Sequence, residues 1–253
     1  MHEVHQLAPH RISSVVDRER VRRWELLAPV VVVLAKEEGS GVTRRGDPLT
    51  HYEELLDYRR SVAALYTRVR ESELGPAETC RQFRMGRDRL FRTHPQSALC
   101  EEQKANFSGL RYYDYDPAFR FLLRVDADVE QTIFEIPLQH DGLTRIQRFG
   151  KIRFVVAGQP VSLSLFWIMG YGGGVFLPFR DSTNNHETYG GGRYLLDTIK
   201  HADLGQEGSR LVIDFNYAYN PSCAYNSRWQ CPLAPVENRL LVAIPAGEQQ
   251  FAA

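Results

Sequence analysis

The stretch that decides the fold reads GYGGGVFLPFRDSTNNHETYGGGRYLLDT over residues 170–198 and LVIDFNYAYNPSCAYNSRWQCPLAPVENRLLVAIPAGE over residues 211–248. Short apolar runs alternate here with glycines, tyrosines, asparagines and charged residues. Glycine weakens a strand unless a bulge, a tight corner or a close backbone approach requires it. We therefore expect short, strongly coiled β-strands, with a polar site among their connections.

Further strands are predicted ahead of this stretch. Phe119, Phe121, Leu123 and Val125 recur at every second position, which is typical of a half-buried strand. In all, the pattern predicts about nine strands, at 119–125, 129–136, 143–149, 152–156, 161–167, 175–179, 193–198, 210–216 and 239–244. Because no helix-length pattern separates them, we expect antiparallel pairing in a mainly β fold, as a β-barrel or a sandwich. The barrel is favoured because closure removes exposed edges.

Two α-helices are predicted before the strands. Thr50 and Glu53 have the spacing of a capping box, and apolar residues follow at helical spacing over 52–71. Gly75-Pro76 ends this helix and begins a second one that reaches about residue 91. The predicted organisation is an N-terminal extension (1–49), a helical segment packed on the barrel (50–110) and a β-barrel domain (111–253).

Composition restricts the classes of partner. Lys plus Arg and Asp plus Glu number 31 each, so no net charge argues for nucleic acid or an anionic membrane. The most apolar run, 26–35, is much shorter than the ~20 residues that span a bilayer. The first residues are polar rather than signal-like, and 4 cysteines in a chain of this length do not suggest a disulfide scaffold. We expect a cytoplasmic protein with neither nucleic-acid nor membrane partners.

Candidate catalytic groups lie between the two glycine triplets, 172–174 and 190–192. Neither triplet is followed by the Lys and Ser or Thr of a phosphate-binding loop, so we interpret them as backbone bulges and corners. Asp181 and Glu187 between them have the chemistry of a general acid and base, and Arg180 or Arg193 that of an anion anchor. Alternatively, these side chains stabilise a hairpin loop by pairing with one another.

The segment 211–220 places a second carboxylate on a strand. Alternation puts Asp214 and Asn216 on one face, opposite a face of apolar and aromatic residues. If the mixed face looks into the fold, Asp214 needs partners or a ligand, since an unpaired buried polar group costs several kcal/mol. If it looks outward, the face is simply solvated.

The cysteines and histidines leave several possibilities open. Cys223 and Cys231 are interpreted as reduced packing thiols, as a disulfide, or as half of a zinc site. Histidines are scattered, and no pair presents two ligands from one element. A metal site would have to be assembled across the fold, with ligands among His94, His186, Glu187, Asp214 and Cys223.

Five motifs are similar to those of a known family: FRTHPQSAL (91–99), YYDYDPAFRF (112–121), ETYGGGRYLLDT (187–198), DFNYAYNPSCAY (214–225) and CPLAPVENRL (231–240). Together they resemble a broad bacterial and archaeal family known only as a conserved domain of unknown function. The resemblance covers residues 52–248 and leaves out the first fifty. It implies a β-rich domain preceded by helices, and it implies no activity.

These observations lead to one functional hypothesis and two alternatives. We expect a small-molecule pocket at one end of the barrel that works by acid–base chemistry, with no cofactor and no metal. The expected catalytic residues are Asp181, Glu187, Tyr189 and Asp214, and the expected substrate-binding residues are Arg180, Arg193, Asn216, Tyr217, Asn220 and Tyr225. The alternatives are a metal-dependent enzyme and a non-catalytic interaction module, for which the tyrosines of YAYNPSCAY would supply a partner surface.

Overall fold

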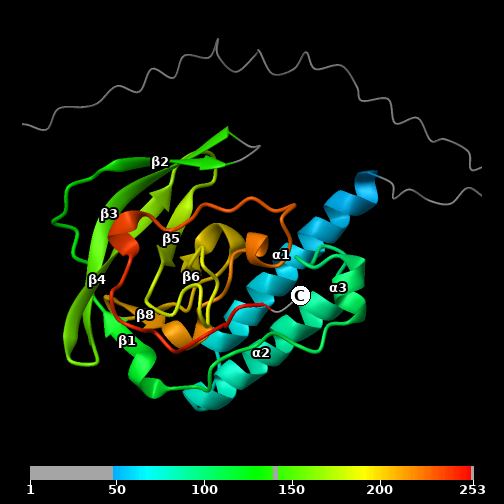
Figure 1. Cartoon of the computed structure of the whole chain (residues 1–253), viewed down its shortest axis with the longest axis horizontal. Coiled ribbons are helices and arrows are strands. Elements are labelled where there is room, and N and C mark those ends of the chain that lie inside the picture. Colours follow the sequence, from blue (N-terminus) through cyan, green and yellow to red (C-terminus); the bar gives the residue numbers. More distant parts are fainter. Residues whose placement is uncertain (1–47, 139–141, 252–253) are drawn as a thin grey trace, which may run out of the picture. The chain divides into compact units, whose positions relative to one another are not determined.

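The computed structural model describes residues 48–138 and 142–251. The predicted extension, 1–49, lies outside these residues except for its last two. In chain order the elements are α1 Pro48–Arg70, α2 Pro76–Thr93, α3 Glu101–Ala105, β1 Arg120–Leu123, β2 Ile133–Leu138, β3 Gly142–Val156, β4 Gln159–Ile168, β5 Gly174–Phe179, β6 Arg193–Asp197, β7 Gln206–Glu207 and β8 Arg210–Asp214 (Figure 1). The mainly β character and the two predicted helices are confirmed.

The strands form two antiparallel sheets. One is a five-stranded meander in the order β2-β3-β4-β5-β6, and the other is three-stranded in the order β1-β8-β7. The two strands predicted at 143–149 and 152–156 are a single strand, β3, whose register with β4 shifts between Arg148 and Gly150. Glycine is required at that bulge because a Cβ on Gly150 would collide with the Val125 side chain.

The predicted closed barrel is wrong for the part of the chain described, and a sandwich-like arrangement of two sheets fits better. The segment predicted as a ninth strand, 239–244, belongs to neither sheet, although Arg239 forms an isolated bridge with Arg180. Its alternate side chains, Leu240, Val242 and Ile244, are nevertheless buried in the core. The alternation therefore predicted burial correctly, while the backbone of this segment does not extend a sheet.

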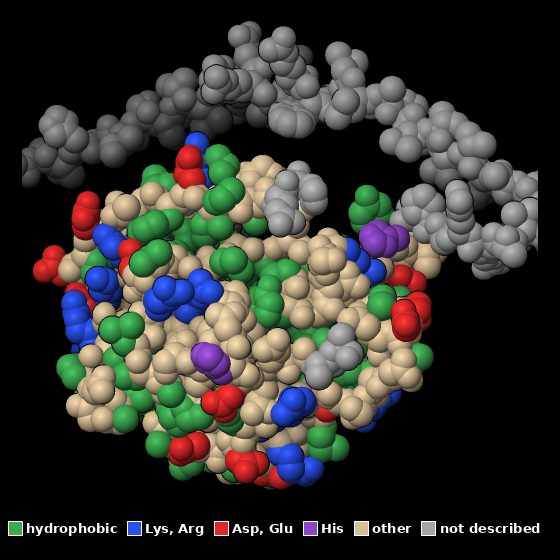
Figure 2. All heavy atoms as spheres, in the orientation of Figure 1, with side chains coloured by type: hydrophobic (Ala, Val, Ile, Leu, Met, Phe, Trp, Pro, Cys, Tyr) green, Lys and Arg blue, Asp and Glu red, His purple; other side chains and the backbone are tan. Residues whose placement is uncertain are grey.

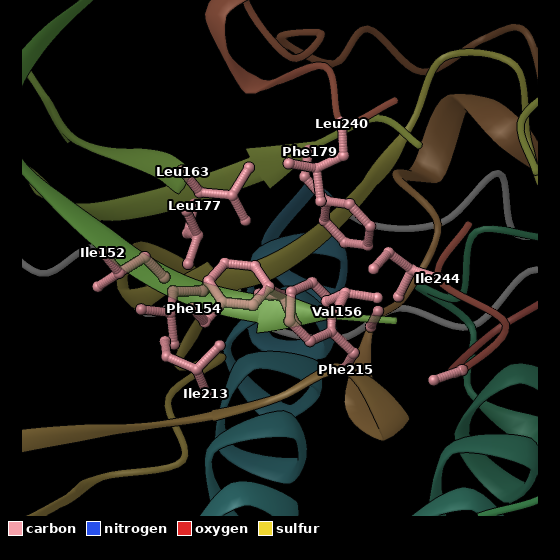
Figure 3. Close-up of a cluster of buried hydrophobic side chains, with 14 of the residues drawn as sticks. Ile152, Phe154, Val156, Leu163, Leu177, Phe179, Ile213, Phe215, Leu240 and Ile244 are labelled. Atoms are coloured by element: carbon pink, nitrogen blue, oxygen red, sulfur yellow. The ribbon is translucent and has the colours of Figure 1, made fainter. Parts of the chain in front are cut away.

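The main core fills the space between the sheets (Figure 3). Ile152, Leu163 and Leu177 come from the five-stranded sheet and meet Ile213 and Phe215 from the other side. The Phe215 ring contacts several other aromatic rings, those of Phe121, Phe154 and Phe179. Residues 213 and 215 thus point inward, so the intervening Asp214 points the other way, toward the helices.

Helices α1 and α2 cover the outer face of the three-stranded sheet. Leu65 and Phe83 pack with Val212 of β8 and with Tyr217 in a second apolar cluster. No helix within the described ranges is long and apolar enough to cross a membrane. On the face displayed in Figure 2, basic and acidic side chains are interspersed.

Candidate functional site

Asp181 and Arg193 form an ion pair in the interior. Arg193 Nη2 donates to Asp181 Oδ2 at 2.9 Å, and both side chains are 0% exposed. The guanidinium also donates to the carbonyl oxygen of Ile244, at 2.9 Å, and to that of Ala246. Asp181 Oδ1 accepts from the N–H and hydroxyl of Thr183 at 2.9 and 2.6 Å. The pair ties the C-terminal segment to the loop after β5 and has no solvent contact through which a substrate would reach it.

The other groups expected in this loop separate from one another. Glu187 is exposed, accepts from the Tyr113 hydroxyl at 3.0 Å, and lines a surface hollow of about 380 Å³ together with His186. Arg180 donates to the carbonyl oxygen of Gly190. The Tyr189 hydroxyl lies 3.7 Å from Cys223 Sγ.

Asn220 and Tyr225 both contact a carboxylate that the sequence patterns did not single out, Glu248. Asn220 Nδ2 donates to Glu248 Oε1 at 3.1 Å, and the Tyr225 hydroxyl donates to the same oxygen. Arg87 of α2 completes the cluster, with Nη2 2.8 Å from Glu248 Oε2. Burial raises the pKa of Glu248 despite the charge of Arg87. Both oxygens of Glu248 are hydrogen-bonded within the cluster, which fastens α2 to the C-terminal segment.

Asp214 is held differently, because only one of its oxygens is occupied. Oδ1 accepts from the backbone N–H of Asn216 at 2.9 Å and from its Nδ2 at 2.8 Å. Asn216 is fixed in turn by the backbone of Asp116, through bonds of 2.9 and 2.8 Å. This side-chain cap ends β8 and begins the 3₁₀ turn Phe215–Tyr217. Asp214 Oδ2 makes no hydrogen bond within the part of the chain that the structure describes.

Asp214 lines a hollow of about 360 Å³ between the helices and the three-stranded sheet. We call it the Asp214 hollow. The end of α1 and the start of α2 supply one wall, and β1, β7 and β8 supply the other. The lining residues are Val69, Arg70, Ser72, Leu74, Pro76, Thr79, Arg120, Leu204, Gly205, Gln206, Glu207, Val212, Asp214 and Tyr217. Of the expected site residues it contains Asp214 and Tyr217, with Asn216 directly behind.

The charges around this hollow are mixed. Arg120 lies directly opposite Asp214 in the β1–β8 register, and its Nη2 is 3.1 Å from Glu207 Oε1. Burial raises the pKa of Asp214, although the Asn216 hydrogen bonds and the positive charges of Arg120 and Arg84 lower it. Burial also raises the pKa of Tyr217, so its hydroxyl remains protonated. A proton donor, a protonatable carboxyl and a guanidinium therefore border one space.

Sequence reasoning missed Arg120, Arg70 and Glu207. Arg120 and Arg70 lie far from Asp214 in the chain, and only strand register and helix packing bring them near. Glu207 is close in sequence, and the pairing of β7 with β8 sets its position. The expected metal ligands are likewise dispersed: His94 pairs with Asp57 at 3.2 Å, whereas His186, Asp214 and Cys223 lie in different places. Among the residues described, no group of three or more His, Cys, Asp and Glu side chains is placed to hold a metal ion.

A hollow larger than the Asp214 hollow lies elsewhere. It measures about 500 Å³ beside α3 and is lined by residues that include Gln103, Asn106, Phe107 and Tyr225. Glu102 is its only carboxylate, and that side chain is exposed. The Asp214 hollow is smaller but brings more ionisable groups together.

Fold and site together define a mainly β protein of two antiparallel sheets. Helices cover one sheet, and a hollow lined by ionisable side chains lies between those helices and that sheet. The chain belongs to the family described as "Protein of unknown function (DUF1684)", which matches residues 105–249. The expected resemblance to a domain of unknown function is thus confirmed as membership of a family. The match begins after α1 and α2, later than residue 52.

Solved structures add a relative. The chain is 31% identical to an uncharacterised protein of Haloarcula marismortui whose solution NMR structure is known, with 68% of this chain and 92% of that one covered and a TM-score of 0.48. Comparison with curated proteins gave no match.

Proposed function

We propose that the Asp214 hollow binds a small polar organic molecule and that Asp214 exchanges a proton with it. The observation that carries the proposal is the state of the Asp214 carboxyl. It is 2% exposed, one oxygen is clamped by Asn216, and the other is unpaired at the wall of a hollow. Oδ2 accepts no hydrogen bond from the residues that the structure describes, and a free carboxylate oxygen at the wall of a hollow is a candidate ligand contact.

The position of Arg120 supports a ligand with an anionic group. Guanidinium binds carboxylates through paired hydrogen bonds, and among the described residues Arg120 forms a salt bridge with Glu207 alone. That pair is half-exposed, and exposed pairs contribute little. A ligand carboxylate can therefore replace or extend it without a large loss.

The pKa of Asp214 supports proton exchange. A general acid or base works best when its pKa lies nearer the working pH than that of an ordinary carboxyl. Burial moves the pKa of Asp214 in that direction. The Asn216 clamp fixes the carboxyl so that Oδ2 is the oxygen that meets the ligand.

A ligand screen tests the proposal. Small mono- and dicarboxylic acids, with and without hydroxyl groups, are screened by ligand-observed NMR against the wild type, Asp214→Asn, Arg120→Gln and Glu187→Gln. Glu187 lines another hollow and serves as the control. We expect at least one acid to bind the wild type and Glu187→Gln equally, with affinity about tenfold lower in the other two variants, a difference of about 1.4 kcal/mol. Equal binding by the wild type and Asp214→Asn, or no binding by any acid, would contradict the proposal.

A further inference from the structure

Cys223 and Cys231 lie side by side outside the Asp214 hollow. Cys223 belongs to the 3₁₀ turn Ser222–Ala224, and its backbone N–H donates to Cys231 Sγ at 3.4 Å. The two thiols are also close enough for each to shift the pKa of the other. Both are free and partly exposed, whereas Cys80 is fully buried. The Cys231 sulfur thus lies against the backbone of Cys223, and both residues are partly open to solvent.

A tyrosine extends this pair into a chain of three groups. The Tyr189 hydroxyl lies 3.7 Å from Cys223 Sγ. Tyr189 comes from the loop before β6, so two separate connections build the arrangement. The Tyr189 hydroxyl is within hydrogen-bonding reach of the Cys223 sulfur, and the Cys223 backbone N–H donates to the Cys231 sulfur. Each donor stabilises negative charge on the sulfur that it reaches, and the last sulfur is that of Cys231.

The surroundings of Cys231 favour its thiolate. Hydrogen bonds from the Cys223 thiol and backbone N–H, with the positive charge of Lys200, lower the pKa of Cys231 to about 6. The same contact raises the pKa of Cys223. The thiolate, and not the thiol, is the nucleophile in cysteine chemistry. Because the Cys223 backbone N–H donates to Cys231 Sγ, we assign Cys231 as the attacking sulfur and Cys223 as its protonated neighbour.

We propose that Cys223 and Cys231 are a reversible dithiol site that reduces hydroperoxides, with Cys231 as the nucleophile and Cys223 as the resolving thiol.

The reaction balances in two steps. The Cys231 thiolate attacks the terminal oxygen of a hydroperoxide; an S–O bond forms, the O–O bond breaks, and the alkoxide leaves and takes a proton to become an alcohol. Cys231 is then a sulfenic acid. The Cys223 thiol attacks its sulfur, an S–S bond forms, and water leaves with the thiol proton. The dithiol loses two electrons, the hydroperoxide gains them, and a small thiol restores the dithiol by exchange.

The sequence allows a direct test of the disulfide. Arg228 lies between the two cysteines, so trypsin separates them into the peptides 211–228 and 229–239. After treatment of the full chain with tert-butyl hydroperoxide, we expect these peptides to be joined, and dithiothreitol to separate them. Cys100, which is also partly exposed, is the internal control and should remain a thiol at the same dose.

Trapping the intermediate tests the assignment of roles. Dimedone, which labels sulfenic acids, should label Cys231 strongly in Cys223→Ser, because no resolving thiol remains. Cys231→Ser should show no label at Cys223. Tyr189→Phe should slow the oxidation of Cys231, because it removes the donor that polarises the Cys223 thiol.

Alkylation of the wild type needs no variant. At pH 6, Cys231 should react with iodoacetamide about tenfold faster than free N-acetylcysteine, because its larger thiolate fraction outweighs its weaker intrinsic nucleophilicity. Several results would overturn the proposal: peptides that remain unjoined after hydroperoxide treatment, dimedone on Cys223 instead of Cys231, or Cys100 oxidised as fast as Cys231. None of these measurements involves the Asp214 hollow, so the two proposals fail separately.

Discussion

Asn216 donates twice to one oxygen of Asp214, from its backbone N–H at 2.9 Å and from its Nδ2 at 2.8 Å. Both bonds end on Oδ1, so Oδ2 remains at the wall of the hollow. The same two bonds end β8 and start the turn that follows. One side-chain contact thus shapes the backbone and orients the carboxyl.

Asn216→Ala removes this contact together with the two bonds to Asp116. Because the lost partners are buried and one is a carboxylate, the free energy of unfolding should fall by roughly 2–4 kcal/mol. Urea denaturation measures the change. Asn226→Ala is the matched control, since the Asn226 side chain accepts an exposed bond from the Arg228 N–H, and alanine keeps the backbone bonds of Asn226. If both variants lose the same free energy of unfolding, the hydrogen bonds of Asn216 contribute no more to stability than an exposed bond does, which would contradict this account.

Asp214→Asn should make the protein more stable at neutral pH. Burial raises the pKa of Asp214 in the folded state above its ordinary value of 3.8, so folding disfavours the charged form. The folded state then binds more protons between the unfolded and folded pKa values, and the free energy of unfolding falls as the pH rises through that window. An amide carries no such charge and still accepts from Asn216.

Denaturation curves of Asp214→Asn and the wild type, recorded from pH 3.5 to 7, measure the difference between their free energies of unfolding. The difference should grow in favour of Asp214→Asn as the pH rises from about 3.8 and then become constant. A variant that is less stable than the wild type at pH 7 would indicate that the charged carboxylate stabilises the fold, contrary to the role proposed here.

Arg87→Met should strongly destabilise the fold. It leaves Glu248 buried at 1% exposure without its ion partner, and breaking a buried pair costs about 3–5 kcal/mol. Arg81→Met on the same helix is the control, because Arg81 and Glu78 are 61% and 39% exposed. Thermal unfolding should show a large loss for the first variant and little change for the second; similar melting temperatures for the two would refute the structural role of the Glu248 cluster.

Gly192→Ala tests the interpretation of the second glycine triplet as a backbone requirement. Gly192 has a φ of +91°, and a Cβ would lie 2.5 Å from the carbonyl oxygen of Phe179. Strain and collision together should cost at least about 2 kcal/mol. Gly75→Ala, where a Cβ meets nothing within 4 Å, is the control for the mutation itself. If the two alanines are tolerated equally, the triplet has another purpose.

Local sequence patterns predicted helices and strands correctly where a residue such as proline, or a regular alternation of apolar residues, determines the backbone conformation. Pro76 begins α2 as expected, and the strands predicted at 152–156 and 161–167 lie in β3 and β4, which pair antiparallel. The alternation over 239–244 correctly indicated which side chains are buried. It could not indicate that the segment pairs with neither sheet, because pairing depends on partners elsewhere in the chain. The barrel prediction was wrong for this reason.

The candidate site was predicted in part. Asp214, Asn216 and Tyr217 are neighbours in sequence, and the structure keeps them together at one hollow. Asp181 and Arg193 are also near in sequence, but their charges satisfy each other in the interior. In sequence, a catalytic pair of opposite charges in one loop looks the same as a structural ion pair. The two are distinguished only by whether the side chains are buried or can be reached by a substrate. The proximity of Arg120 to Asp214 could not be predicted from sequence, because it arises from the register of β1 with β8.

The most direct test of the central claim is a carbon-13 NMR titration of the Asp214 carboxyl, assigned with Asp214→Asn, in the free protein and with the best acid from the screen. The account predicts a pKa above the ordinary 3.8 in the free protein, and a further change of that pKa when the acid binds. A carboxyl that titrates at or below 3.8 and does not respond to any bound acid would contradict it.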